Sequence, residues 1–328
     1  MLAAFERAAA LHAPIERHIR IADHAIELQI SAPVLAERLW PAFAGLEVPA
    51  AEFPDLTISC WDANAAGVSA PRAPFSIREF LPNGTVRGHA EGRIRVTYDA
   101  WIRMITVYDR DRRHAWVCVA DQGSVPKWFE RAPFRTILRW WADDAALVPM
   151  HASAVARNGE AIVVAGASGS GKSTTGLACV AAGWEFIADD FCMITSGAEP
   201  TVHPVYCLAK IEPDALDRLP SLARFVVDPD SEQLVVNPAS RLGQSARVRA
   251  VLLGRITASV STSVTPIDTN TAFRTLVQAS VLEGLGAGTQ TLAALAALLR
   301  TVVCAQVELG SDPDRVVDMM QTVLDGLP

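Results

Sequence analysis

Residues 161–190 read AIVVAGASGSGKSTTGLACVAAGWEFIADD, a stretch that passes from an apolar run through a glycine-rich turn into a helical pattern. An apolar run at 162–165 predicts a buried strand. A helical pattern at 173–182 stops at Gly183, a residue type that commonly ends helices. Four residues between these elements match the pattern G-x-x-x-x-G-K-[ST]: Gly166, Gly171, Lys172 and Ser173. A strand, a glycine-rich turn and a helix in this order are typical of a phosphate-binding P-loop.

The glycine-rich turn predicts a cradle of backbone N–H groups that converge on a nucleotide phosphate. The N-terminal end of the following helix adds a partial positive charge at the same point. Lys172 is expected to reach the β- and γ-phosphates, and the Ser173 hydroxyl is expected to ligate Mg²⁺. The residues expected to bind the nucleotide are Gly166, Ser168, Gly169, Ser170, Gly171, Lys172, Ser173 and Thr174.

Two adjacent aspartates follow the second apolar run of this stretch, at 184–188. In an open parallel sheet ligands bind at the carboxyl ends of the strands, so Asp189 and Asp190 are expected beside the loop. Neighbouring strand residues point to opposite faces, so both carboxylates serve one site only if the strand ends or bends there. One would then hold Mg²⁺ with Ser173, and the other would accept the proton of an attacking hydroxyl. The alternative is that one aspartate only forms the turn.

A histidine is predicted to lie beside the loop through a β-hairpin. The strand predicted at 151–156 is joined by an Asn-Gly turn to the strand before the loop. With this two-residue turn Ala156 faces Ala161, and His151 faces Gly166. His151 is therefore a candidate site residue, and the alternative is a surface or core histidine without a role.

Composition restricts the classes of partner and the compartment. The chain has 328 residues, 50% of them hydrophobic, which suffices for one large or two ordinary domains. A net charge of −7 without a long basic run disfavours nucleic acid or an anionic membrane as a partner. Charged residues near the N-terminus leave no signal-peptide h-region, and no apolar stretch approaches the length of a membrane span. Six scattered cysteines without a C-x-x-C pair indicate buried thiols, so we expect a cytoplasmic protein.

Two domains are predicted, a β-rich domain at 1–145 and an α/β domain at 146–328. The first begins with an amphipathic helical stretch over about 1–20, with Pro14 as a break, and ends with a helical connector at 127–141. Between these helices short strands are predicted at 24–30, 56–60, 75–81, 85–89, 93–98, 103–108 and 114–120. Their close spacing and an Asn-Gly turn predict an antiparallel meander.

The second domain continues beyond the aspartates with a proline-punctuated, loop-rich segment at 196–245. Its further strands are predicted at 193–195, 202–208, 233–236, 247–256 and 303–309. Its further helices are predicted at 271–281, 289–302 and 313–327.

Residues 150–191 resemble the nucleotide-binding core of the HPr kinase/phosphorylase family, whose fold is similar to that of phosphoenolpyruvate carboxykinase. The resemblance rests on the histidine strand, the Asn-Gly hairpin, the P-loop and an acidic pair that begins only 17 residues after Lys172. It implies that ATP and Mg²⁺ are used, that Asp189 activates an acceptor serine, and that Asp190 helps to hold the metal. It also implies that His151 lies nearby and that the chain forms a homo-oligomer, with hexamers suggested by the family.

The resemblance is looser outside this core. The glycine-rich segment that supports phosphorolysis in the family is not recognisable, and HPVYCLAKIEP at 203–213 stands in its place. Glu212 is a candidate metal ligand in that region. Three arginines are candidates for the family's arginine-containing loop: Arg241, Arg247 and Arg249. The first 140 residues show no resemblance, so the chain is similar to divergent relatives with a β-rich front half, some of which phosphorylate a serine of a ribosomally made precursor peptide.

The leading hypothesis is an ATP-dependent kinase that transfers the γ-phosphate to a serine of a peptide or small protein. A small-molecule kinase is the alternative from the same chemistry, because the segment at 196–245 could close over a metabolite as readily as over a peptide. A non-catalytic nucleotide-sensing module is disfavoured, because binding alone does not need a second adjacent acid. The residues of the N-terminal half leave open whether it binds substrate, mediates oligomers or caps the kinase core.

Overall fold

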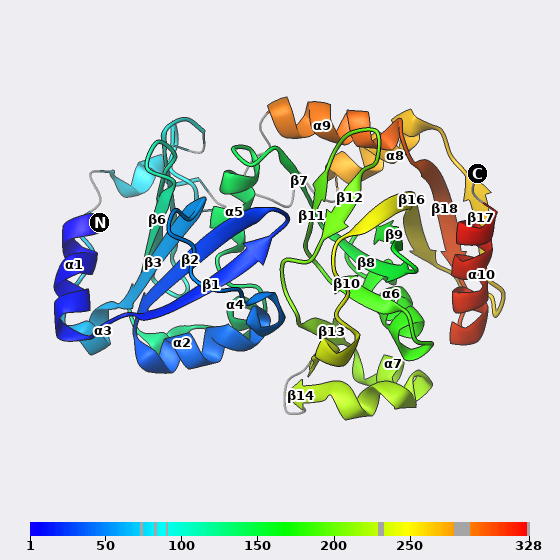
Figure 1. Cartoon of the computed structure of the whole chain (residues 1–328), viewed down its shortest axis with the longest axis horizontal. Coiled ribbons are helices and arrows are strands. Elements are labelled where there is room, and N and C mark those ends of the chain that lie inside the picture. Colours follow the sequence, from blue (N-terminus) through cyan, green and yellow to red (C-terminus); the bar gives the residue numbers. More distant parts are fainter. Residues whose placement is uncertain (73–74, 82–83, 90, 229–232, 279–288, 327–328) are drawn as a thin grey trace. The chain divides into compact units, whose positions relative to one another are not determined.

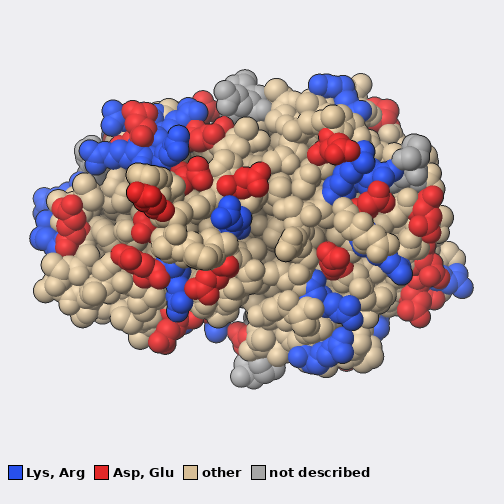
Figure 2. Space-filling model, viewed as in Figure 1, with Lys and Arg blue, Asp and Glu red and all other residues tan. Residues whose placement is uncertain are grey.

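The computed structural model describes the chain except residues 73–74, 82–83, 90, 229–232, 279–288 and 327–328. It divides into two compact units, Met1–Ala145 and Ala146–Pro328. Each unit combines helices with its own β-sheet (Figure 1). Acidic and basic side chains lie intermixed over the face shown in Figure 2. Among the described helices, none combines the length and hydrophobicity that a membrane span requires.

The N-terminal unit contains a six-stranded sheet with the order β1-β2-β3-β6-β5-β4. Its strands are β1 (Ile15–Ile21), β2 (His24–Ser31), β3 (Leu56–Asp62), β4 (Ile94–Asp99), β5 (Met104–Asp109) and β6 (His114–Val119). Strands β2 and β6 both pair with β3 in parallel, so the prediction of an antiparallel domain is wrong for the centre of this sheet. Parallel pairing is allowed because the segments before and after β3 are long enough to cross over the sheet. Only β4, β5 and β6 form the predicted antiparallel meander.

The helices of this unit are α1 (Leu2–Leu11), α2 (Pro33–Leu39), α3 (Ala63–Ala66), α4 (Lys127–Arg131) and α5 (Arg135–Ala142). Short 3-10 helices are η1 (Trp40–Ala42), η2 (Ala44–Leu46), η3 (Ile77–Glu79) and η4 (Gln122–Ser124). The helix α1 ends at Leu11, before the predicted break at Pro14, and the helical pattern predicted after the break is wrong, because Ile15–Ile21 form strand β1. The helix predicted over 127–141 is interrupted between Arg131 and Arg135, where Phe134 adopts a φ of 59°.

Two strands predicted in the N-terminal unit are not formed. The described residues around 75–81 and 85–89 contain η3 and isolated bridges in place of strands. The turn predicted at Asn83 lies outside the described residues.

The C-terminal unit is built on a nine-stranded mixed sheet with the path β10-β8-β9-β16-β12-β11-β7. Off this path, β18 pairs with β16 in parallel and β17 pairs with β18. The strands are β7 (Leu147–Met150), β8 (Ala152–Arg157), β9 (Glu160–Ala165), β10 (Glu185–Ala188), β11 (Cys192–Thr195), β12 (Thr201–His203), β16 (Ala246–Ile256), β17 (Ser263–Pro266) and β18 (Val303–Leu309).

The segment predicted to be loop-rich contains a small sheet of its own, with the order β13-β15-β14. Its strands are β13 (Ala209–Ile211), β14 (Val226–Asp228) and β15 (Leu234–Val236). The helices around it are α7 (Pro213–Arg218), η5 (Pro220–Phe225) and η6 (Ala239–Arg241).

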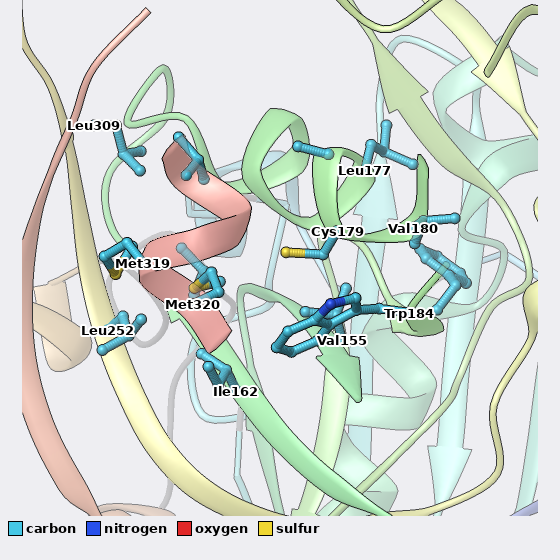
Figure 3. Close-up of a cluster of buried hydrophobic side chains, with 14 of the residues drawn as sticks. Val155, Ile162, Leu177, Cys179, Val180, Trp184, Leu252, Leu309, Met319 and Met320 are labelled. Carbon is cyan, nitrogen blue, oxygen red and sulfur yellow. The ribbon is translucent and has the colours of Figure 1, made fainter. Parts of the chain in front are cut away.

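Helices cover both faces of the nine-stranded sheet. On one face, α6 (Lys172–Ala181) and α10 (Pro313–Asp325) pack with alternate residues of the central strands, and Leu177, Met320 and Ile162 meet in this core (Figure 3). On the other face lie α8 (Thr269–Leu276) and α9 (Thr289–Leu299), which pack against the intervening strand residues. Because their residues alternate between the two covered faces, β9 at 161–165 and β16 at 250–253 are apolar and buried on both sides.

Gly176 brings α6 close to β8, and this contact gives a stability prediction. A Cβ atom on Gly176 would overlap the hydroxyl of the buried Ser153, which donates a hydrogen bond to the Ala188 carbonyl at 3.2 Å. We expect Gly176→Ala to lower the free energy of unfolding by about 2 kcal/mol in urea titrations, although alanine normally favours a helix. Adding Ser153→Ala should restore much of the loss, and a double variant as unstable as the sum of the single variants would contradict the overlap.

Candidate active site

The glycines of the motif lie between β9 and α6, in a turn that we call the glycine loop (residues 166–171), and Lys172 and Ser173 begin α6. Gly166 has a φ of 144° and Gly171 a φ of 93°, a backbone region that side chains rarely tolerate. A Cβ atom on Gly166 would also lie 2.7 Å from the Ser170 hydroxyl, and one on Gly171 would lie 2.6 Å from Leu309 Cδ1. Both conformation and space therefore require glycine at the two ends of the loop.

Lys172 places a positive charge inside the glycine loop. Its side chain is curled back, with Nζ donating to the carbonyl oxygens of Gly166 at 2.9 Å and Ala167 at 3.0 Å. Only 7% of the residue is exposed. Removal from water strengthens the field of this ammonium group, so the loop attracts anions.

The hairpin before the loop has the predicted register. Ala156 pairs with Ala161, and the ladder runs on to the pair of Ala152 with Ala165. His151 directly precedes β8 and therefore stands at the level of the loop. Its Nδ1 atom lies 3.1 Å from Asp190 Oδ1 and 2.8 Å from the Asp190 carbonyl oxygen. The hairpin thus brings the histidine to the second aspartate.

Asp189 and Asp190 directly follow β10, and we call them the acid pair. In the sheet, only β8 lies between β10 and β9. The Phe191 amide donates to the Asp189 carbonyl at 2.8 Å, and Asp190 between them has a φ of 68°. This tight turn costs a non-glycine residue on the order of 1–3 kcal/mol and persists only where its surroundings hold it. The chain therefore bends between the two aspartates, which is the condition for both carboxylates to serve one site.

Asp189 is the more buried acid, with 4% of the residue exposed. Burial raises the pKa of its carboxyl to about 6, and the charge of Asp190 adds to this shift. The Ser173 hydroxyl and the Lys210 amide, which donates to Oδ2 at 3.2 Å, partly offset it. The other oxygen, Oδ1, is buried without a hydrogen bond from the described residues. A carboxyl whose pKa lies this close to neutral is suited to exchange a proton.

Lys210 is a site residue that the sequence analysis missed. It lies on β13, and its Nζ atom is 3.7 Å from Asp190 Oδ1. The sequence offers one signal for it: the chain has only three lysines among its 29 basic residues, and two of them, Lys172 and Lys210, lie at this site. The contact could not be predicted from the sequence, because no residue pattern indicates the small sheet that holds β13 near the acid pair.

The remaining candidates fall into two groups. Ser168, Ser170 and Thr174 lie in the glycine loop or at the start of α6, as predicted. Glu212 accepts a hydrogen bond from Gln233 Nε2 at 2.6 Å and makes no contact with the acid pair among the described interactions.

The three arginines that are candidates for the family's arginine-containing loop have their described partners away from the glycine loop. Arg247 pairs with Glu199 at 3.3 Å and Arg249 pairs with Glu160, both at the beginning of β16. Because β16 runs parallel to β9, this end of the sheet lies about 20 Å from the glycine loop. Arg241 donates instead to the Gly183 carbonyl at 3.4 Å, beyond the far end of α6.

The donor atoms at the site are oxygens, which suit Mg²⁺. They come from Ser173 at the start of α6 and from the acid pair. No group of three or more His, Cys, Asp and Glu side chains in the described part of the chain is arranged to hold a metal ion. A magnesium site here would therefore be completed by phosphate oxygens and water, as is usual for this ion.

Known sequences do not match this chain, and a solved structure has a distant likeness to it. No protein-family model matches the chain, and no curated protein sequence is significantly similar to it. Among solved structures, the Hpr(Ser) kinase/phosphatase from Coxiella burnetii is similar to 54% of this chain and 94% of its own. The two are 8% identical with a TM-score of 0.29, which is too low to support an argument about fold or activity.

Proposed function

We propose that this chain is a kinase that transfers the γ-phosphate of ATP to a hydroxyl group. The observation that carries the proposal is Asp189, a buried carboxyl with a raised pKa and with one oxygen that has no hydrogen-bond partner among the described residues. It adjoins Ser173 and is separated by one strand from the glycine loop. Perturbed carboxyl groups of this kind are typical of proton-transferring sites. A loop that only binds a nucleotide does not need a proton-accepting carboxyl group.

Each residue has a role in this proposal. The backbone N–H groups of the glycine loop hold the phosphates, and Lys172 neutralises the charge that develops on the transferred group. Asp189 accepts the proton of the attacking hydroxyl, a role for which its raised pKa is suited. Ser173 and Asp190 would hold Mg²⁺, which when bound neutralises phosphate oxygens. His151 orients Asp190 through Nδ1.

The acceptor that we propose is a serine of a peptide or small protein, the acceptor class that the sequence resemblance implies. Transfer can be tested by incubating the full chain with γ-labelled ATP, Mg²⁺ and a cell extract separated by size. We expect label in the peptide or protein fraction, recovered as phosphoserine after acid hydrolysis. Label confined to small molecules would indicate a metabolite kinase. Bound ATP without transfer in any fraction would contradict the kinase proposal.

A further inference from the structure

Two exposed aliphatic side chains lie beyond the glycine loop, on the side away from the acid pair. Ile256 ends β16, and 61% of this residue is exposed. Its Cγ1 atom would lie 3.2 Å from a Cβ on Gly171, so the side chain lies against the backbone of the loop. Val260 follows four residues later and is 56% exposed. Neither side chain can donate a hydrogen bond to a phosphate.

The segment that carries these side chains is fixed to the end of β18. The Thr257 amide donates to the Leu309 carbonyl at 2.9 Å, and the Gly310 amide donates to the Thr262 hydroxyl at 3.1 Å. The Ser311 amide donates to the Ser259 carbonyl at 3.0 Å. Side chains on a backbone held in this way are preorganised, which lowers the entropy cost of binding a ligand.

The strand order fixes the direction in which a bound nucleotide must run. Four neighbouring strands lie in the order β10, β8, β9 and β16. The acid pair follows β10, and the glycine loop follows β9. Adjacent strands are about 4.8 Å apart, so the acid pair lies about 10 Å to one side of the loop and the end of β16 about 5 Å to the other. A triphosphate whose γ end meets the acid pair therefore directs its nucleoside toward β16 and Ile256.

We infer that Ile256 and Val260 form the surface on which the nucleoside of the bound nucleotide packs. The inference rests on the proposed function, because that function sets the direction of the triphosphate. A flat base is the part of a nucleotide whose burial against aliphatic groups is favourable. Ile256 lies where the base needs an apolar partner, against the loop that holds the phosphates, and Val260 lies on the segment that follows it.

Calorimetric titration with ATP and with inorganic tripolyphosphate, both with Mg²⁺, separates the nucleoside contact from the phosphate contact. We expect the native chain to bind ATP more tightly than tripolyphosphate. Ile256→Ser should weaken ATP binding about tenfold and leave tripolyphosphate binding unchanged, which also shows that the loop is intact. The matched control is Val303→Ser at the other end of β18, where the residue is 40% exposed, and it should change neither affinity.

The outcomes distinguish this inference from the proposed function. Equal affinity of the native chain for the two ligands would overturn the inference and leave the kinase proposal standing. Ile256→Ser affecting both ligands or neither would also overturn it, including the case in which the variant changes only the oligomeric state. If the native chain binds neither ligand, the proposed function fails, and the inference fails with it.

Discussion

Asp189→Asn is expected to slow phosphate transfer about a thousandfold while ATP still binds. Asparagine keeps the size of the side chain and can still accept the Lys210 amide, but it cannot take a proton from an attacking hydroxyl. Transfer of γ-label and calorimetric ATP affinity, measured on the same preparation, check the two halves of this expectation. Asp217→Asn, which changes an exposed carboxylate on α7, should leave both values at the native level. Near-native turnover of Asp189→Asn would remove the proton-accepting role.

The same substitution should stabilise the folded chain at neutral pH. The pKa of Asp189 is about 6 in the folded chain against an ordinary value of 3.8, so between these pH values the folded state holds a proton that the unfolded state has released. The free energy of unfolding of the native chain therefore falls as the pH rises from about 4 to about 6. Above that range Asp189→Asn should be more stable by on the order of 2 kcal/mol in urea titrations. A variant that loses activity while gaining stability has not lost activity by unfolding.

Lys172→Met is expected to weaken ATP binding by about a hundredfold or more, the second large effect. The ammonium group is almost fully buried inside the glycine loop, and losing a charged partner of phosphate in such a place typically costs 2–5 kcal/mol. Methionine preserves the aliphatic stem, so the packing of α6 is little disturbed. Titration with ATP and Mg²⁺ measures the effect.

The control for this variant is Lys127→Met. Lys127 lies on α4 in the N-terminal unit, where its ammonium group is 3.6 Å from Glu130 on the same helix. Its replacement should leave ATP affinity unchanged. If Lys172→Met bound ATP as tightly as the native chain, the glycine loop would not be the phosphate site.

The parts of the site that adjoin one another in sequence were predictable. Residues 161–190 contain a strand, a turn and a helix whose signals are local, and the Asn-Gly turn sets the hairpin register without reference to the rest of the chain. That register places His151 at the level of the loop. The bend between Asp189 and Asp190 was stated as a condition for a shared site, and the turn at Asp190 fulfils it.

The parts that depend on long-range pairing were not predictable. Lys210 reaches the acid pair only because β13 pairs with β15, a contact between segments without a strong pattern. That Arg247 lies at the end of the sheet opposite the glycine loop follows from the parallel pairing of β16 with β9, which cannot be predicted from the residues of β16. The parallel pairing of β3 in the N-terminal unit was not predicted either, because short, closely spaced strands are also typical of an antiparallel meander.

The dependence of kcat/KM on pH, for release of the γ-phosphate from ATP, tests the central claim most directly. This parameter reports the ionisation of the free enzyme, where the pKa of Asp189 is about 6. The account predicts that kcat/KM of the native chain rises with pH, levels off above about pH 6, and loses this rise in Asp189→Asn. A rise that persists unchanged in the variant would contradict it.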